Sequence, residues 1–232
     1  MRQKYRLSHL LLILFLGWGL AGCDSDSDDS IVNGKNVYDV YSYPTYTLTE
    51  DMKYSLAYMW HEEKLAKDIY LALAAVYSND KMTMIAEHGE VNHITMVQDL
   101  VEKYDLNITN LNDYEISYTE AELEALAAGE FAVPELQTLY DDLYAEGSVS
   151  AEAALKVGCK VEVTDINDLT LYISQAGEAE DLVDVFTYLR SGSYKHYWAF
   201  DAELKTLGVA EGCCSVGVVN GIDYCHNEYP QN

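Results

Sequence analysis

Five residues with metal-binding side chains fall at positions where a helical core would otherwise be apolar. They are Glu63, Glu90, His93, Glu162 and His196. Each lies on the apolar face of a predicted helix, and the set comes from four different helices. Burying a carboxylate is unfavourable unless a proton or a cation compensates its charge, and one shared cation would compensate all of these groups at once. The pattern therefore predicts a metal site inside a helical bundle.

Glu90 and His93 form a Glu-x-x-His motif within one predicted helix. Residues three apart lie on the same face of a helix, so this carboxylate and this imidazole can bind one metal ion together. Glu63 lies about sixteen residues before the turn at 78–80, and His93 lies about fourteen residues after it. Because a helix rises by about 1.5 Å per residue, we expect the two side chains at a similar depth.

The second half of the predicted site has a different set of residues. Glu162 lies about fifteen residues before the turn near Gly177, and His196 lies about nineteen residues after it. Ser193 stands three residues before His196, where a second Glu-x-x-His motif would have its carboxylate. Asp165, one turn after Glu162, is expected either to supply the missing ligand or to hydrogen-bond to an imidazole. If Asp165 does not reach the site, we expect one metal, or a second that binds weakly.

The predicted ligand set consists of carboxylates and two imidazoles. Such a set suits iron or manganese, and zinc can also occupy it, whereas calcium would not select two histidines. Two redox-active ions bridged by carboxylates can react with dioxygen or peroxide. Tyr70 lies one helical repeat after Glu63, where it is expected to pack in the core, to hydrogen-bond a ligand or to carry an electron.

Other polar residues near these positions have simpler interpretations. Glu62 lies about 100° around the helix from Glu63 and is expected in solvent. His61 and His88 lie off the apolar face and are expected at the surface. His226 lies in the C-terminal tail, where a structural or exposed position is expected.

The residues around these side chains predict helices and no strands within the domain. Apolar residues recur at steps of three and four along four long segments. These segments are approximately 51–77, 81–104, 151–175 and 178–207. Short turns join the first two and the last two, so each pair must run antiparallel, and residues 105–149 between the pairs predict a crossover with short helices. The expected fold class is all-α, a four-helix bundle of two antiparallel pairs with a helical crossover insertion.

Several segments, in this order and at this spacing, resemble known ferritin-like proteins. The string from Glu63 to Tyr70 is similar to the first-helix motif of rubrerythrin-like di-iron proteins. Residues 55–208 more closely resemble the ferritin-like family known as domain of unknown function 2202. The segments that carry this resemblance are Glu62–Tyr70, Glu90–His93, Pro134–Asp141, Val161–Ile166 and Gly192–His196. The resemblance implies a ferritin-like bundle with a dinuclear iron site.

The first residues have the features of an export signal. Residues 1–22 combine a basic start with an apolar run that is too short to span a bilayer comfortably. The string Leu20-Ala21-Gly22-Cys23 resembles the lipobox of bacterial lipoproteins, which implies cleavage before Cys23 and a lipid on its sulfur. We therefore expect a protein of the bacterial cell envelope, anchored outside the cytoplasmic membrane by this lipid alone.

Composition divides the rest of the chain into three parts. Residues 23–50 are acidic and predict a tether, residues 51–208 predict the bundle, and residues 209–232 form a cysteine-containing tail. Residues 1–22 hold three of the 14 Lys+Arg and none of the 39 Asp+Glu, so without them the net charge changes from −25 to −28. So acidic a chain attracts cations and is repelled by nucleic acid and by anionic membrane surfaces.

Four cysteines remain besides Cys23, namely Cys159, Cys213, Cys214 and Cys225. In an oxidising compartment an even number of cysteines favours disulfides. A bond between the neighbours Cys213 and Cys214 would be strained, so we expect Cys159 to pair with one of these two and Cys225 with the other. A second metal site in the tail, with His226, is the alternative.

These features favour an oxidoreductase that oxidises ferrous iron with dioxygen or peroxide, or that removes peroxide. One alternative is a module that buffers iron or manganese without turnover. Another is a structural lipoprotein whose bundle binds a second envelope protein. The sequence does not specify the substrate, the electron donor or the oligomeric state, and it is compatible with a homo-oligomer.

Overall fold

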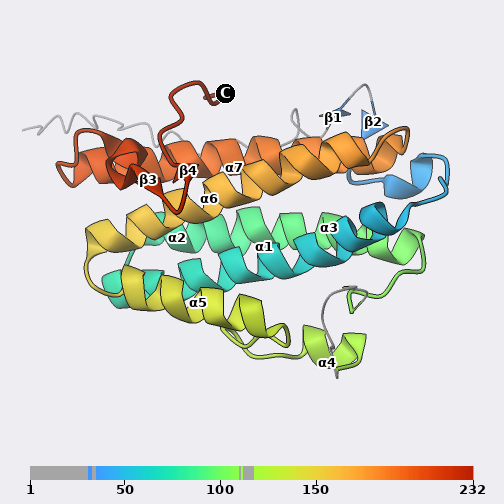
Figure 1. Ribbon diagram of the computed structural model, residues 1–232, viewed down its shortest axis with the longest axis horizontal. Coiled ribbons are helices and arrows are strands. Elements are labelled where there is room, and N and C mark those ends of the chain that lie inside the picture. The colour runs from blue at the N-terminus through green and yellow to red at the C-terminus, as the bar shows by residue number, and fades with distance from the viewer. Residues whose placement is uncertain (1–30, 33–34, 110, 112–117, 232) are drawn as a thin grey trace, which may run out of the picture.

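The computed structural model describes residues 31–32, 35–109, 111 and 118–231. The predicted export signal, Cys23 and the first part of the predicted tether lie outside these ranges. Within them the protein is mostly helical (Figure 1), which confirms the expected all-α class. None of the described helices is long and apolar enough to cross a membrane.

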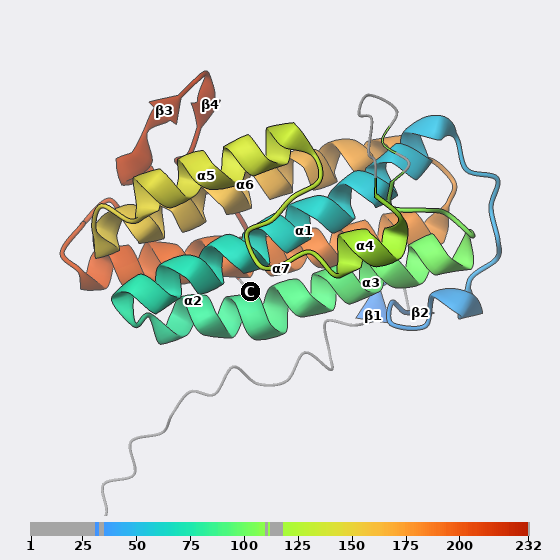
Figure 2. The same ribbon diagram turned by 90° about the horizontal axis from the view of Figure 1, so that it is seen from below.

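Four long helical segments lie side by side and form most of the structure (Figures 1 and 2). The first segment is α1 (Glu50–Tyr77). The second begins with α2 (Asp80–Met84), passes through a π-helical turn, η2 (Ile85–Glu90), and continues as α3 (Val91–Lys103). The third and fourth are α6 (Ala151–Gln175) and α7 (Glu180–Thr206). Because α1 and α7 each pack against both α3 and α6, the four segments share one interior.

The remaining elements are short or lie outside this interior. The crossover between α3 and α6 contains α4 (Glu120–Glu124) and α5 (Pro134–Gly147), and α5 packs along α1 and α6 (Figure 2). Two antiparallel hairpins complete the described chain, β1 (Ile31–Val32) with β2 (Lys35–Asn36) and β3 (Val218–Val219) with β4 (Ile222–Asp223). Ile31 pairs with Asn36 in the first hairpin, and Val218 pairs with Asp223 in the second.

Side chains that cap backbone N–H groups mark where the helices begin. Thr49 accepts a hydrogen bond from the backbone of Met52 at the start of α1, and Ser150 caps α6 in the same way. These bonds satisfy donors that the first turn of a helix leaves without partners. Ser78 ends α1 in the left-handed conformation and so reverses the chain into α2.

Two apolar clusters fill the interior, and a layer of polar side chains separates them. Along α1 most buried residues up to Trp60 belong to one cluster and those from Leu65 belong to the other, which also includes Ala57. Along α7 the change falls between Leu189 and Tyr197, and a similar change occurs between η2 and α3 and along α6. The buried polar residues at this level are Glu63, Glu90, His93, Glu162, Asp165 and Ser193. The predicted metal ligands therefore lie between two apolar regions that shield them from water.

The disulfide-bonded tail lies against α6 and α7. Cys159 of α6 is bonded to Cys213, and Cys214 is bonded to Cys225, which is one of the two pairings expected from the sequence. The short 3₁₀ helix η3 (Gly212–Val216) carries the first two tail cysteines. These bonds place the β3–β4 hairpin beside α6 (Figure 1).

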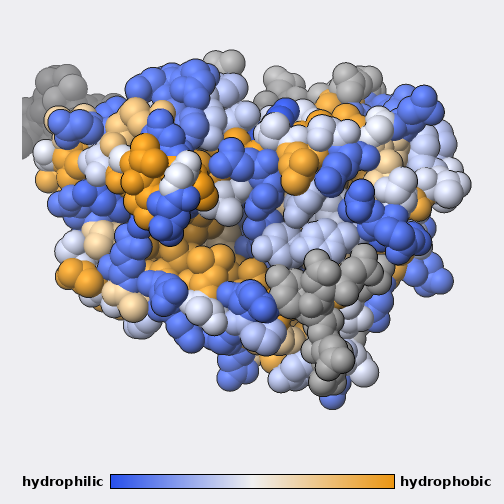
Figure 3. Space-filling view, viewed as in Figure 1, coloured by the Kyte–Doolittle hydropathy of each residue, from blue (hydrophilic) through white to orange (hydrophobic). Residues whose placement is uncertain are grey.

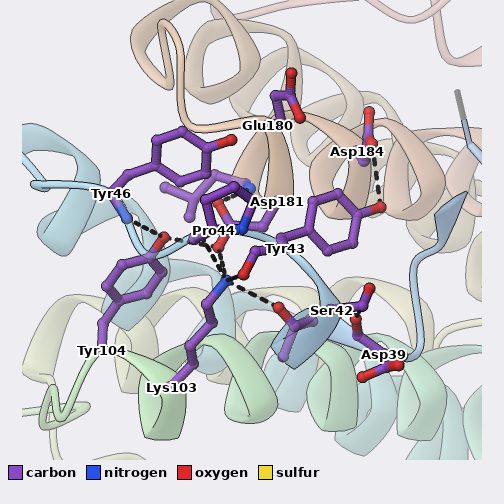
Figure 4. Close-up of polar contacts among 12 residues, drawn as sticks. Asp39, Ser42, Tyr43, Pro44, Tyr46, Lys103, Tyr104, Glu180, Asp181 and Asp184 are labelled. Carbon is purple, nitrogen blue, oxygen red and sulfur yellow. Dashed lines mark hydrogen bonds and ion pairs between the residues drawn. The ribbon is translucent and has the colours of Figure 1, made fainter.

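Lys103 fastens the segment that precedes α1 to the end of the helical core (Figure 4). Its ammonium donates hydrogen bonds to the carbonyls of Val40, Tyr43 and Pro44 at 2.8, 3.3 and 3.1 Å, and to Oδ2 of Asp181 at 2.6 Å. The 3₁₀ helix η1 (Val40–Ser42) lies within this segment. The sequence predicted a tether as far as residue 50, but this part of it packs on the core because Val40 and Tyr43 are buried there.

Replacing Lys103 should destabilise the protein, because Asp181 is fully buried and would lose its cation. We expect Lys103→Met to lower the free energy of unfolding by about 3–5 kcal/mol. Urea denaturation measures the change. Lys53→Met is the matched control, since the Lys53–Glu50 pair is largely exposed and such pairs contribute about 0–1 kcal/mol. Equally small effects of the two substitutions would contradict the role given to Lys103.

Candidate metal centre

The polar layer brings five predicted metal ligands together from four helical segments. α1 contributes Glu63, the junction of η2 and α3 contributes Glu90 and His93, α6 contributes Glu162, and α7 contributes His196. The three carboxylates are 1–2% exposed. The fold thus brings together side chains that are up to 133 residues apart in the sequence, from Glu63 to His196.

The five residues form two triads that share Glu90. One triad is Glu63, Glu90 and His93, the other is Glu90, Glu162 and His196, and within each the ligand atoms lie within 4.8 Å of one another. Nδ1 of His93 lies 3.2 Å from Oε2 of Glu63 and 3.1 Å from Oε2 of Glu90. Nδ1 of His196 lies 3.0 Å from Oε1 of Glu90 and 3.6 Å from Oε1 of Glu162. The two oxygens of Glu90 therefore face different imidazoles.

A glycine on the facing helix sets the position of each imidazole. A Cβ atom at Gly192 would lie 2.4 Å from Nε2 of His93, and a Cβ atom at Gly89 would lie 2.5 Å from Nε2 of His196. Only a glycine leaves room for the ring at these two places. The close packing on the Nε2 side keeps Nδ1 of each ring directed toward the carboxylates.

Each of the two glycines belongs to a short sequence pattern with a histidine. Gly89 lies four residues before His93, and Gly192 lies four residues before His196, so the string Gly-x-x-x-His occurs once in each half of the site. In this alignment Ser193 corresponds to Glu90. The repeat places a glycine and a histidine at the same spacing in both halves, and only one half has a carboxylate directly after the glycine.

The π-helical turn η2 was also not predicted, because apolar periodicity suggested one continuous helix over 81–104. It spans Ile85–Glu90 and ends at the shared carboxylate. A π turn accommodates more residues than an α turn, and such turns are frequent at functional sites. Here the π turn sets how far the helix is rotated about its axis where Gly89 and Glu90 face the polar layer.

Several buried atoms of this layer have no hydrogen-bond partner among the described residues. They are Oε1 of Glu63, Oε1 of Glu90, Oδ1 of Asp165 and Nδ1 of His196. Oε1 of Glu90 and Nδ1 of His196 are only 3.0 Å apart, yet their geometry is not that of a hydrogen bond. Buried polar atoms normally have partners. A divalent cation within each triad would supply partners for the atoms of Glu63, Glu90 and His196, so the residues present fit a metal centre.

Charges within the layer shift the protonation of its residues. Burial raises the pKa of Glu63 to about 7, although the imidazole of His93 acts in the opposite direction. Burial would lower the pKa of His196, but the carboxylates of Glu90 and Glu162 raise it to about 10. In the metal-free protein, protons on the imidazoles therefore offset the carboxylate charge. A cation that binds at Nδ1 must displace such a proton.

Asp165 does not belong to either triad, although it was predicted as a sixth ligand. Its Oδ2 accepts a short hydrogen bond from the hydroxyl of Ser193, and its side chain is 8% exposed. Burial, together with the charges of Glu63 and Glu162, raises its pKa well above the ordinary value. Asp165 therefore borders the centre beside Ser193, at the position where the second half lacks a glutamate.

Tyr70 packs in the apolar core and also donates a hydrogen bond to a predicted ligand, which are two of the three roles expected for it. It is fully buried, and its hydroxyl donates to Oε1 of Glu162 at 2.5 Å. The bond fixes the Glu162 carboxylate, as residues around metal ligands commonly do.

Two residues that we expected in solvent are buried wholly or in part. His61 is 2% exposed, and its Nε2 lies 3.1 Å from the carbonyl of Ile108, because the start of the crossover covers this side of α1. Glu62 is partly buried beside Asp168 of α6, and its Oε2 is buried without a hydrogen-bond partner. The prediction for each was wrong, because it did not include the crossover that covers His61 or the close approach of α6 to Glu62. His88 is exposed, as expected.

Gly192→Ala should destabilise the protein, although alanine favours a helix over glycine by about 1 kcal/mol. The new methyl group would collide with the His93 ring, and overpacking of this kind costs about 1–3 kcal/mol. Thermal or urea denaturation measures the difference in stability between the variant and the unaltered protein. Ser191→Ala, at an exposed neighbour on the same helix, is the control and should change stability by less than about 0.5 kcal/mol. A gain in stability for Gly192→Ala would refute the packing described.

Comparisons with known proteins identify a family that matches this chain, one relative and one similar solved structure. The family described as "Uncharacterized protein domain (DUF2202)" matches residues 52–213. Uncharacterized protein MJ0754 of Methanocaldococcus jannaschii is 34% identical over 169 residues, which are 73% of this chain and 83% of that protein. The crystal structure of hypothetical protein MJ0754 from Methanococcus jannaschii matches with a TM-score of 0.61 and 33% identity, over 72% of this chain and 86% of that one. The chain therefore belongs to the DUF2202 family.

Proposed function

We propose that this protein is a dinuclear metal protein whose four long helical segments form a ferritin-like four-helix bundle. The observation that carries the proposal is the Glu90 carboxylate, which faces one imidazole with each oxygen and joins two ligand triads. The buried atoms without partners in these triads support it. Four antiparallel helices that each direct ligands inward are typical of di-iron carboxylate proteins.

Each triad would hold one ion, and Glu90 would bridge the pair. Glu63 and His93 complete the first position, and Glu162 and His196 complete the second. Carboxylates with imidazoles favour iron or manganese, and zinc also fits them. Bound iron or manganese would supply one-electron redox changes, which suit the reduction of dioxygen or peroxide.

Different residues of the chain would have different roles in such a centre. The imidazoles are held by Gly89 and Gly192, so their Nδ1 atoms keep a fixed direction. Tyr70 orients Glu162 through its hydroxyl, whose oxygen lies 2.5 Å from Oε1 of that carboxylate. The two apolar clusters on either side exclude water from the layer. A shielded and pre-organised ligand set is what a metal centre requires for controlled redox chemistry.

The reaction we propose is the oxidation of ferrous iron by dioxygen or peroxide, or the removal of peroxide. One observation favours a second candidate, a protein that buffers metal without turnover. Ser193 occupies the position equivalent to Glu90 and binds Asp165, so the second half has one carboxylate fewer than a symmetric site. A weaker second position would suit exchange of metal ions better than redox chemistry.

We also propose that the protein is a lipoprotein of the bacterial cell envelope. The support is the Leu20-Ala21-Gly22-Cys23 string, which lies outside the described residues. A lipid on Cys23 would place the acidic domain outside the cytoplasmic membrane, where metal ions are its natural partners and nucleic acid is not.

Metal titration of the metal-free full chain tests the proposed centre. We expect about two Fe²⁺ or Mn²⁺ ions per chain under anaerobic conditions, and about one after either His93→Ala or His196→Ala. Loss of binding should be complete in the double variant. His88→Ala removes an exposed histidine and should bind as the unaltered chain does. Full occupancy in a folded His93→Ala/His196→Ala variant would rule the centre out.

Oxygen uptake by the ferrous-loaded chain then separates the two candidate functions. A redox enzyme should consume dioxygen faster than free Fe²⁺ at the same concentration, with a change in absorbance, and His88→Ala should do the same. Tight binding without accelerated uptake of dioxygen or peroxide would favour the buffering function.

A further inference from the structure

A cavity of about 320 Å³ opens between α1, α5, α6 and the β3–β4 hairpin. Figure 3 shows apolar surface at this place, between α5 and α6 and below the hairpin. The walls are mainly apolar and include Leu65, Leu136, Leu139, Leu143, Val161 and Val219. Four acidic residues also line the cavity: Glu62 comes from α1, Asp165 from α6, and Asp142 and Glu146 from α5. Packing of the apolar side chains alone does not explain why this cavity has carboxylates in its lining.

Of these four, Glu62 and Asp165 each have a buried oxygen without a hydrogen-bond partner in the described part of the chain. These atoms are Oε2 of Glu62 and Oδ1 of Asp165, and the Asp165 side chain is more than nine-tenths buried. A carboxyl oxygen that carries no proton accepts hydrogen bonds or binds a cation. Neither of these two atoms has such a partner among the described residues, and the cavity is where a donor or a cation can reach them.

Asp165 connects the cavity with the candidate metal centre. It lies one helical turn after Glu162, and its other oxygen accepts the hydrogen bond of Ser193, which lies one turn before His196. The Asp165 carboxylate thus borders both the cavity and the polar layer. An ion held between Glu62 and Asp165 would be next to the centre and still in contact with the cavity.

The other opening near the centre is much less suitable for a cation. It measures about 60 Å³ and lies between α3 and α7, where Asn92 and Lys195 line it together with the two imidazoles. It has no carboxylate in its lining, and the rings that close it are packed against Gly89 and Gly192.

We propose that Glu62 and Asp165 form a transit site for divalent metal ions and that the cavity beside α5 is the route by which these ions reach the centre. The inference rests on the dinuclear centre proposed above. Charges near low-dielectric walls attract a cation more strongly than charges in open water. Lys160 also lines the cavity, but both oxygens of Glu146 bind its ammonium, at 2.6 and 2.7 Å. Its charge is therefore compensated.

Kinetics of metal loading test this route. The metal-free full chain is mixed with Co²⁺ in a stopped-flow instrument, and the absorbance of the bound ion is followed over time. Glu62→Gln keeps the shape of the side chain and removes its charge, so loading should slow on the order of tenfold. The final number of bound ions should not change. Glu135→Gln makes the same change at an exposed position of α5 outside the cavity and should load at the normal rate.

Two further variants distinguish the route from a general effect of charge. Leu139 lies at the cavity and is 42% exposed, so Leu139→Trp can narrow the opening without disturbing the core and should also slow loading. Asn92→Leu narrows the opposite opening and should leave the rate unchanged. Slowing by Asn92→Leu alone, or normal rates in both Glu62→Gln and Leu139→Trp, would overturn the inference while leaving the centre intact. Absence of binding in the unaltered chain would instead overturn the proposed function and this inference with it.

Discussion

The compensation of buried carboxylate charge is the constraint on which the rest of this structure depends. Glu63, Glu90 and Glu162 lie where three of the four helical segments would otherwise continue an apolar face, and water cannot solvate them there. Only the two imidazoles, protons or bound cations can offset their charge. The polar layer therefore lowers the stability of the fold. It can persist only if its side chains remain close together.

Much of the surrounding structure follows from keeping that layer intact. The core is divided into two apolar clusters, and each of the four segments passes from one cluster to the other at the level of the ligands. Gly89 and Gly192 let the facing helices approach closely enough for the imidazoles to reach the carboxylates. The crossover helix α5 and the disulfide-bonded tail add an outer layer beside α6, and this layer forms the cavity that leads to Asp165.

Apolar periodicity was sufficient to predict the four long segments and to place the five ligands at one level, because a helix converts sequence spacing directly into position. The predicted range 151–175 coincides with α6, and 51–77 differs from α1 by one residue. Residues governed by contacts between helices were not predictable in this way. The π-helical turn before Glu90, the burial of His61 by the crossover and the bond between Asp165 and Ser193 depend on neighbours that are distant in sequence. The Gly-x-x-x-His repeat was visible, but its meaning needed the facing helix.

The central claim is that Glu90 bridges two metal positions. Anomalous diffraction from crystals of the protein loaded with manganese or iron, recorded at the absorption edge of the metal, tests it most directly. The account predicts a pair of peaks within the polar layer, one beside Nδ1 of His93 and one beside Nδ1 of His196, with the Glu90 carboxylate between them. A single peak away from Glu90, or metal found only at surface carboxylates, would contradict it.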